Sequence, residues 1–80
     1  MAIVRLFAAA REAAGTGHDE LPGATVSDVL DAARARYGPA FADILATCRV
    51  WVNGDSAVDS TLVGPDDEVA VLPPVSGGAA

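Results

Sequence analysis

The chain has 80 residues, of which 51% are hydrophobic, and a formal net charge of −6. This length allows one small domain, and the hydrophobic content is too high for a disordered chain. The acidic balance argues against a nucleic-acid partner, because phosphate binding needs clustered basic side chains and this chain has no lysine and five scattered arginines.

The sequence also argues against export and membrane insertion. No apolar run approaches the ~20 residues of a membrane span, and residues 1–5 lack the charged and apolar regions of a secretory signal. The single cysteine, Cys48, cannot form a disulfide within the chain and fits a reducing compartment. We therefore expect a cytoplasmic protein without a membrane partner.

The first part of the chain predicts a strand, a short helix and a second strand. Residues 2–8 are rich in side chains that favour strands. Residues 8–14 have high helix propensity and are followed by Gly15, a residue that often ends helices. Residues 16–21 predict the second strand, which a Pro-Gly pair then closes.

The main helix is predicted by its two ends and by its apolar spacing. Thr25 is a candidate N-cap, and Asp28 stands where a capping box has its acidic residue. Gly38-Pro39 ends the helix, and residues 41–45 predict a further short helical turn. One helix face is apolar, at positions spaced for a period of 3.6 residues: Val26, Val29, Leu30, Ala33 and Tyr37.

The second half of the chain predicts three more strands. Residues 48–53 alternate and lead into Asn53-Gly54, which is a strong signal for a tight turn. Residues 56–58 are expected to return as a short edge strand, and residues 68–72 form the last strand. A mixed sheet of four or five strands with one main helix on one face is a two-layer α+β sandwich.

Strand alternation divides the sheet's side chains between two faces. The face under the helices is expected to form the core from Val4, Leu6, Val50, Val52, Val69 and Val71, against Val29, Leu30, Ala33, Phe41 and Ile44. The opposite face carries Ile3, Arg5, Phe7, Arg49, Trp51, Ala70 and Leu72. An apolar patch with tryptophan and arginine is typical of a protein interface, so we expect partner contacts from Arg5, Phe7, Trp51 and Leu72. The alternative is that loops or the first helix cover this patch.

The chain shows no catalytic constellation. His18 is the only histidine, and we interpret it as an exposed strand or turn residue rather than a general base. Cys48 opens a strand that faces the core, which favours burial over nucleophilic attack. Residues 66–68 are acidic but lack a calcium-loop pattern, so no metal site is predicted.

The end of the chain differs from the rest. Two prolines that cannot continue a strand precede two glycines with the slimmest backbone available. Extended at ~3.3 Å per residue, residues 73–78 would reach ~20 Å. We therefore expect a domain at residues 1–72 and a flexible tail at residues 73–80. The tail would enter a narrow site through Pro73, Pro74, Val75, Ser76 and Gly77.

These features resemble the ubiquitin-like sulfur carriers, and above all the small, sulfur-carrying subunit of molybdopterin synthase. The resemblance rests on the order of the elements, on residues 7–12, Val52-Asn53 and residues 66–69, and most specifically on the ending Pro-Pro-Val-Ser-Gly-Gly at residues 73–78. Sulfur carriers of the thiamine pathway share the Gly-Gly end but are typically shorter and lack the paired prolines.

The resemblance implies a β-grasp fold whose first and last strands lie parallel in the centre of the sheet. It implies that an E1-like adenylyltransferase adenylates Gly78 with ATP, and that a thiocarboxylate is then formed there. The tail would deliver this sulfur to a pterin precursor in the large subunit of molybdopterin synthase. Phe7, Arg11 and the open sheet face would contact the partners. The chain would have no catalytic residues and bind no cofactor itself, and would act as the sulfur-donating subunit of a sulfurtransferase complex.

Ala79-Ala80 depart from the family pattern, in which the second glycine is terminal. Because only a terminal carboxylate can be adenylated, we expect a metal-dependent peptidase to remove both alanines first. The alternatives are an added extension or a carrier that is never activated. For the function, the alternatives are sulfur delivery to thiamine, cysteine or tRNA, a ubiquitin-like modifier joined through Gly78 to lysines, or a plain interaction module.

Overall fold

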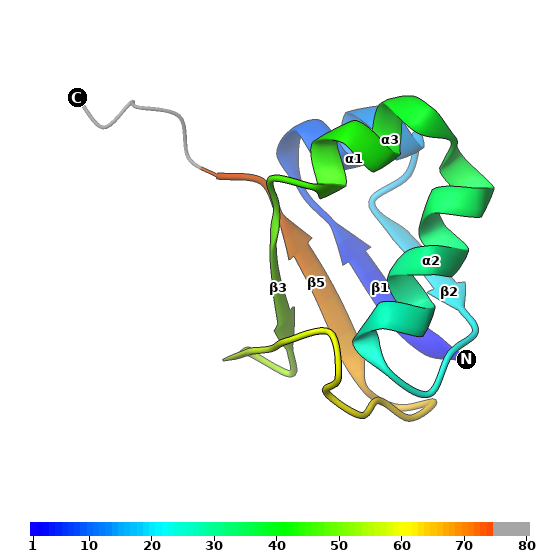
Figure 1. Ribbon diagram of the computed structural model, residues 1–80, viewed down its shortest axis with the longest axis vertical. Helices are drawn as coiled ribbons and strands as arrows, with labels where there is room; N and C mark the ends of the chain where they lie inside the picture. The colour runs from blue at the N-terminus through cyan, green and yellow to red at the C-terminus, as the bar shows by residue number, and fades with distance from the viewer. Residues whose placement is uncertain (75–80) are drawn as a thin grey trace.

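The computed structural model describes residues 1–74, which form one sheet and three helices. Figure 1 shows the helices on one side of the sheet, with α2 lying across it and α1 and α3 packed together at one end. In chain order the elements are β1 (Ala2–Leu6), α1 (Ala8–Ala14), β2 (His18–Leu21), α2 (Val26–Tyr37), α3 (Pro39–Leu45), β3 (Arg49–Val52), β4 (Asp55–Ser56) and β5 (Glu68–Leu72).

The sheet has five strands in the order β2-β1-β5-β3-β4. The first and last strands, β1 and β5, are parallel neighbours at its centre, and the other pairs are antiparallel. Val4 lies opposite Val69 in the parallel pair, and Val52 lies opposite Val69 on the other side. This topology confirms the predicted α+β sandwich of the β-grasp type.

The core lies between the sheet and the helices. Phe41 of α3 is its largest fully buried side chain and meets the ring of Tyr37 edge-to-face, with 5.1 Å between the ring centroids. The predicted core positions are confirmed, although Val50 and Ile44 are only half-buried. The sequence-based list had omitted several members of the buried cluster: Ala2, Ala10, Leu21, Leu45 and Val63.

The ends of α2 follow the predicted local chemistry. The amide of Asp28 donates a hydrogen bond of 3.2 Å to the hydroxyl of Thr25. The carboxylate of Asp28 accepts in turn from the amide of Ala24, at 3.3 Å, so both groups cap the first turn. Gly38 ends the helix with φ at 91°, a left-handed value that favours glycine, and Pro39 begins α3.

The predicted bounds of four strands differ from the observed ones. β1 ends at Leu6 rather than at residue 8, and β3 is Arg49–Val52 rather than residues 48–53. β2 begins at His18 rather than at Thr16, because the hydroxyl of Thr16 folds back to bond the backbone of His18. β4 is Asp55–Ser56 rather than residues 56–58. Its position is set by the two-residue turn at Asn53-Gly54, whose φ values of 52° and 87° are both left-handed and fit the tight hairpin predicted there.

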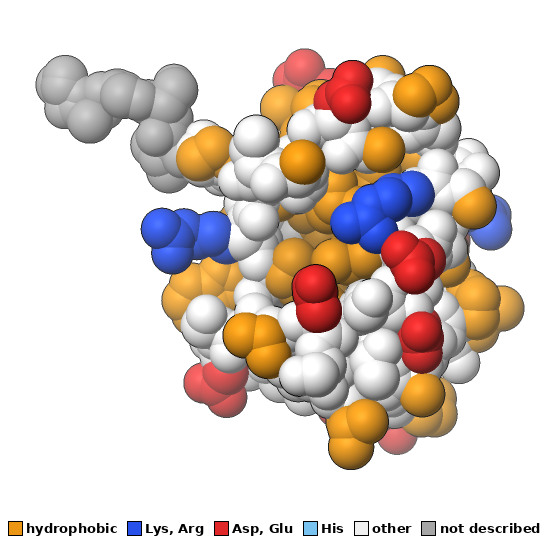
Figure 2. Space-filling model, in the orientation of Figure 1, with side chains coloured by type: hydrophobic (Ala, Val, Ile, Leu, Met, Phe, Trp, Pro, Cys, Tyr) orange, Lys and Arg blue, Asp and Glu red, His pale blue; other side chains and the backbone are white. Residues whose placement is uncertain are grey.

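The helix side of the molecule has a mixed surface. Figure 2 shows acidic side chains spread over this face and hydrophobic side chains lining a central hollow. Within residues 1–74, no helix has the length and apolar character needed to span a membrane.

Candidate functional site

The side of the sheet without helices, which we call the open face, is assembled by strand register. Arg5 of β1 lies opposite His18 of β2 and Ala70 of β5, and Ala70 lies opposite Trp51 of β3. Leu72, the last residue of β5, lies opposite Arg49. The structure therefore brings the sequence-predicted open-face residues together on neighbouring strands.

The open face is less exposed than the alternation pattern suggested. Phe7 is 39% exposed, whereas Trp51 and Leu72 are half-buried. The guanidinium carbon of Arg5 lies 6.0 Å from the centroid of the Phe7 ring. The same guanidinium approaches the carboxylate of Glu68 at 3.5 Å, and both side chains are nearly half exposed, so we expect this ion pair to contribute little to stability.

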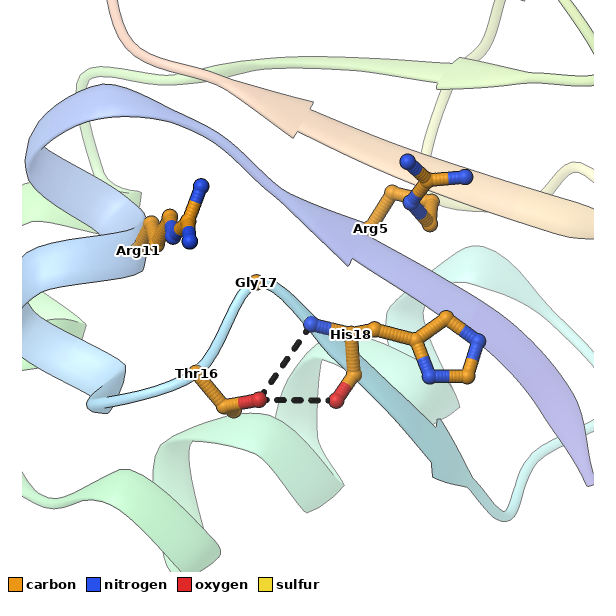
Figure 3. Close-up of a pocket in the computed structure, with 5 residues that line it drawn as sticks. All are labelled: Arg5, Arg11, Thr16, Gly17 and His18. Carbon is orange, nitrogen blue, oxygen red and sulfur yellow. Dashed lines mark hydrogen bonds between the residues drawn. The ribbon is translucent and has the colours of Figure 1, made fainter.

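A depression of about 460 Å³ adjoins this face, between β1, α1 and β2. Figure 3 shows Arg5 and His18 on adjacent strands and Arg11 reaching from α1 beside the loop of Thr16 and Gly17. These five residues line the depression. Two of the five, Arg5 and Arg11, carry a positive charge in a chain whose formal net charge is −6, and Arg5 is paired with Glu68.

The loop under Arg11 is held by short-range contacts. The hydroxyl of Thr16 donates to the carbonyl of His18 at 2.9 Å and lies 3.3 Å from its amide. A Cβ atom added to Gly17 would stand only 3.1 Å from Nε of Arg11 and 3.3 Å from its Cδ. The absence of a side chain at Gly17 therefore lets the Arg11 side chain lie close against this loop.

The last strand, β5, ends beside the start of α1, at the same end of the molecule as the depression. The amide of Phe7 donates to the carbonyl of Val71 at 3.3 Å, next to the start of α1. Pro73 is half-buried and Pro74 is exposed. The remaining predicted tail residues, Val75, Ser76, Gly77 and Gly78, lie outside the described residues, as do Ala79 and Ala80.

Two other candidate reactive side chains are Cys48 and His18. Burial raises the pKa of the Cys48 thiol, which disfavours the reactive thiolate, and its sulfur lies 3.2 Å from the carbonyl of Ile44. His18 is exposed, as predicted. Within residues 1–74, no group of three or more His, Cys, Asp or Glu side chains could hold a metal ion.

The chain matches a known protein family over most of its length. Residues 4–78 match the model of the ThiS family. The chain belongs to the ThiS family. The match includes both the open face and the glycine pair of the tail, so the family pattern covers the domain and its ending alike.

Two relatives of this ThiS-family chain share a name. This chain is 35% identical over 81 aligned positions to the molybdopterin synthase sulfur carrier subunit of Phaeosphaeria nodorum, with 90% of this chain and 84% of that protein covered. It is 33% identical over 78 positions to the protein of the same name from Arabidopsis thaliana, with 94% and 80% covered.

A solved structure resembles the fold over nearly its full length. The small archaeal modifier protein 1 of Methanosarcina acetivorans superimposes with a TM-score of 0.87 at 34% identity, covering 96% of this chain and 95% of that one. The β-grasp fold is thus shared between this ThiS-family chain and a protein named as a modifier.

The sequence alone did not find the depression. His18 and Arg11 lie seven residues apart with a helix end and a loop between them, and Gly17 carries no side chain to attract attention. The signal that was available is the pairing of the first two predicted strands. An antiparallel register places Arg5 beside His18.

Proposed function

We propose that this protein is a sulfur carrier of the molybdopterin synthase small-subunit type. The observation that carries the proposal is its similarity, over at least 90% of its length, to two proteins named as sulfur carrier subunits of that synthase. The family match through residue 78 supports it further, because the match includes the glycine pair on which such chemistry depends.

In this proposal the reactive group is the carboxylate of Gly78. An E1-like partner binds ATP, and the carboxylate attacks its α-phosphorus and releases pyrophosphate. The resulting acyl-adenylate is a mixed anhydride. Hydrosulfide attacks its carbonyl carbon, the bond to the phosphate oxygen breaks, and AMP and a proton leave to give a thiocarboxylate. Glycine suits this position because no side chain obstructs attack at the carbonyl carbon. The chain itself supplies the acyl group and binds no cofactor.

The described domain suits the role of a platform for such a tail. β5 occupies a central position in the sheet, with β1 and β3 bonded on its two sides, and it ends at Leu72 directly before the tail. The open face beside it offers Phe7 and the half-buried Trp51 and Leu72 for contact with the large synthase subunit and the activating enzyme. We propose that these contacts hold the domain while the tail enters each active site.

We further propose that Ala79-Ala80 are removed by a metal-dependent peptidase before activation. The test is to incubate the full chain and a form that ends at Gly78 with the E1-like enzyme and ATP, and to measure acyl-adenylate. We expect the adduct only with the form that ends at Gly78. An adduct on the untrimmed chain would refute the trimming step, and no adduct on either form would refute the activation.

A second function is favoured by the similarity to the small archaeal modifier protein 1. A modifier would be joined through Gly78 to lysines of target proteins. This chain has no lysine, so it could not build lysine-linked chains of itself. Conjugates of higher mass, recovered from cells that lack the sulfur-transfer enzyme, would favour this second function over sulfur delivery.

A further inference from the structure

Asn53-Gly54 is the dipeptide of this chain that can lose ammonia without an enzyme. Asn53 is the only asparagine in the sequence, and there is no glutamine. Both residues of the pair are exposed to water at the turn between β3 and β4. The backbone nitrogen of Gly54 can attack the side-chain carbonyl carbon of Asn53, and glycine carries no side chain that would obstruct this attack.

The reaction is a deamidation in two steps. In the first, a bond forms between the nitrogen of Gly54 and Cγ of Asn53, the bond from Cγ to the side-chain nitrogen breaks, and ammonia leaves with the proton of the Gly54 amide. The product is a succinimide ring. In the second step, water adds to one of the two ring carbonyls and the bond from that carbonyl to the ring nitrogen breaks. This leaves either an aspartate or an isoaspartate, in which the backbone continues through the former side chain.

The fold holds the Asn53 side chain away from this reaction. Its nitrogen donates to the carboxylate of Asp67 at 2.9 Å, and its oxygen accepts from the amide of Glu68 at 2.9 Å. The backbone amide of Asn53 also donates to the carbonyl of Glu68 at 2.9 Å. Both polar atoms of the side chain are therefore bonded to the start of β5, and rotation towards the nitrogen of Gly54 would break both bonds.

Either product would disturb the contact with β5. An aspartate at position 53 has no donor for the carboxylate of Asp67, so two like charges would face each other where the hydrogen bond now lies. An isoaspartate would lengthen the backbone of a two-residue turn and so disturb the register in which Trp51 pairs with Ser56. Deamidation should therefore weaken the hairpin and its attachment to β5.

We propose that Asn53 is a deamidation site that the closed hairpin protects, and that its conversion loosens the attachment of this turn to β5. The reaction then proceeds from the molecules in which the side chain has left Asp67 and Glu68. It converts chains that have opened into chains that open more often. The site lies at the start of β5, whereas the tail follows the end of this strand, so the proposal is independent of the proposed sulfur chemistry.

The test is to follow the high-resolution intact mass of the full 80-residue chain in mildly alkaline buffer, with and without concentrated guanidinium chloride. Because Asn53 carries the only side-chain amide, the mass change from amide to acid reports this site alone. We expect deamidation to be at least about ten-fold slower in the folded chain, the factor that two exposed hydrogen bonds of modest net strength give. Equal rates in the two conditions would overturn the proposal, and so would the absence of deamidation in denaturant.

Two matched variants assign the protection to the contact with Asp67. Asp67→Ala removes the acceptor and should speed deamidation of the folded chain at least about three-fold, the factor for one such hydrogen bond. Asp66→Ala, one residue away, should leave the rate unchanged. In denaturant, both variants should react at the wild-type rate. Equal acceleration in the two variants, or none in Asp67→Ala, would refute the role of this contact.

A third variant tests the effect of the product. Asn53→Asp should unfold at a lower urea concentration than the wild type at neutral pH. The difference should shrink in acid, where one of the two carboxyl groups is protonated and becomes a donor to the other. The wild-type chain, deamidated in denaturant and returned to buffer, should show the same lower midpoint. A midpoint equal to that of the untreated wild type in both preparations would overturn the proposed loosening.

Discussion

The hydroxyl of Tyr37, at the end of α2, makes a hydrogen bond to β2 that should stabilise the packing of these two elements. It donates to the carboxylate of Asp19, which also pairs with Nε of Arg36 at 3.0 Å. Tyr37→Phe deletes only this donor, because the ring can keep its edge-to-face contact with Phe41 and Asp19 keeps Arg36. Burial, together with Asp19, raises the pKa of Tyr37, so the hydroxyl keeps its proton throughout the neutral range.

The expected loss in the free energy of unfolding is modest. A hydrogen bond to a charged group contributes about 1.5–3 kcal/mol when well buried, and partial exposure here reduces that to about 1 kcal/mol. For a domain of this size, that corresponds to a fall in Tm of about 4–8 °C. Urea unfolding of the wild type and Tyr37→Phe at pH 7 measures the difference.

The same variant should show a defined pH dependence. The hydrogen bond from Tyr37 is the main cause that holds the pKa of Asp19 below its ordinary value of 3.8, with burial opposing it. The stabilisation is therefore fully present above pH 3.8 and is lost as the pH falls through the lower pKa of the folded state. The stability difference between wild type and Tyr37→Phe should shrink in that acidic range. A difference of zero at pH 7, or one that grows in acid, would refute this reasoning.

Three further changes test other parts of the fold by the same unfolding measurements. Phe41→Ala removes the largest fully buried side chain and should cost about 3–5 kcal/mol; a cost below about 1 kcal/mol would contradict its place in the core. Gly54→Ala should cost about 1 kcal/mol from its φ of 87° alone, because an added Cβ meets nothing within 4 Å, whereas Gly64→Ala, with an ordinary contact at 3.7 Å, is the neutral control. Hydrogen bonds from the Asn53 side chain and the Gly64 amide lower the pKa of Asp67, so Asp67→Asn should lose the part of the fall in stability below pH 3.8 that Asp67 contributes, while the part due to Asp19 remains; an acid limb as steep as that of the wild type would contradict this, and Asp66→Asn is the matched control.

Elements with local chemical signals could be predicted from the sequence. The cap at Thr25, the stop at Gly38 and the turn at Asn53-Gly54 depend on a few neighbouring residues, and each was confirmed. The bounds of β5 at Glu68–Leu72 were also correct, because the apolar run between a turn and a proline pair leaves little choice. The resemblance placed β5 beside β1, and the observed parallel pairing confirms it.

Features that depend on distant partners were predicted less well. Ala57 and Val58 have the composition of a strand, but the hairpin register pairs Trp51 with Ser56 and ends β4 there. Alternation placed Trp51 on the correct face but could not tell how far its neighbours cover it. The depression needs the register of β1 with β2 and the position of α1, neither of which a single residue pattern specifies.

The carbonyl carbon of Gly78 is the centre of the proposed function, and one measurement tests it most directly. The intact mass of the protein recovered from its native cell reports both the residues at its end and the atoms of its terminal carboxylate. The account predicts a species that ends at Gly78, with one carboxylate oxygen replaced by sulfur in part of the population. A protein that retains Ala79-Ala80 and never carries sulfur, even in cells with active sulfur transfer, would contradict it.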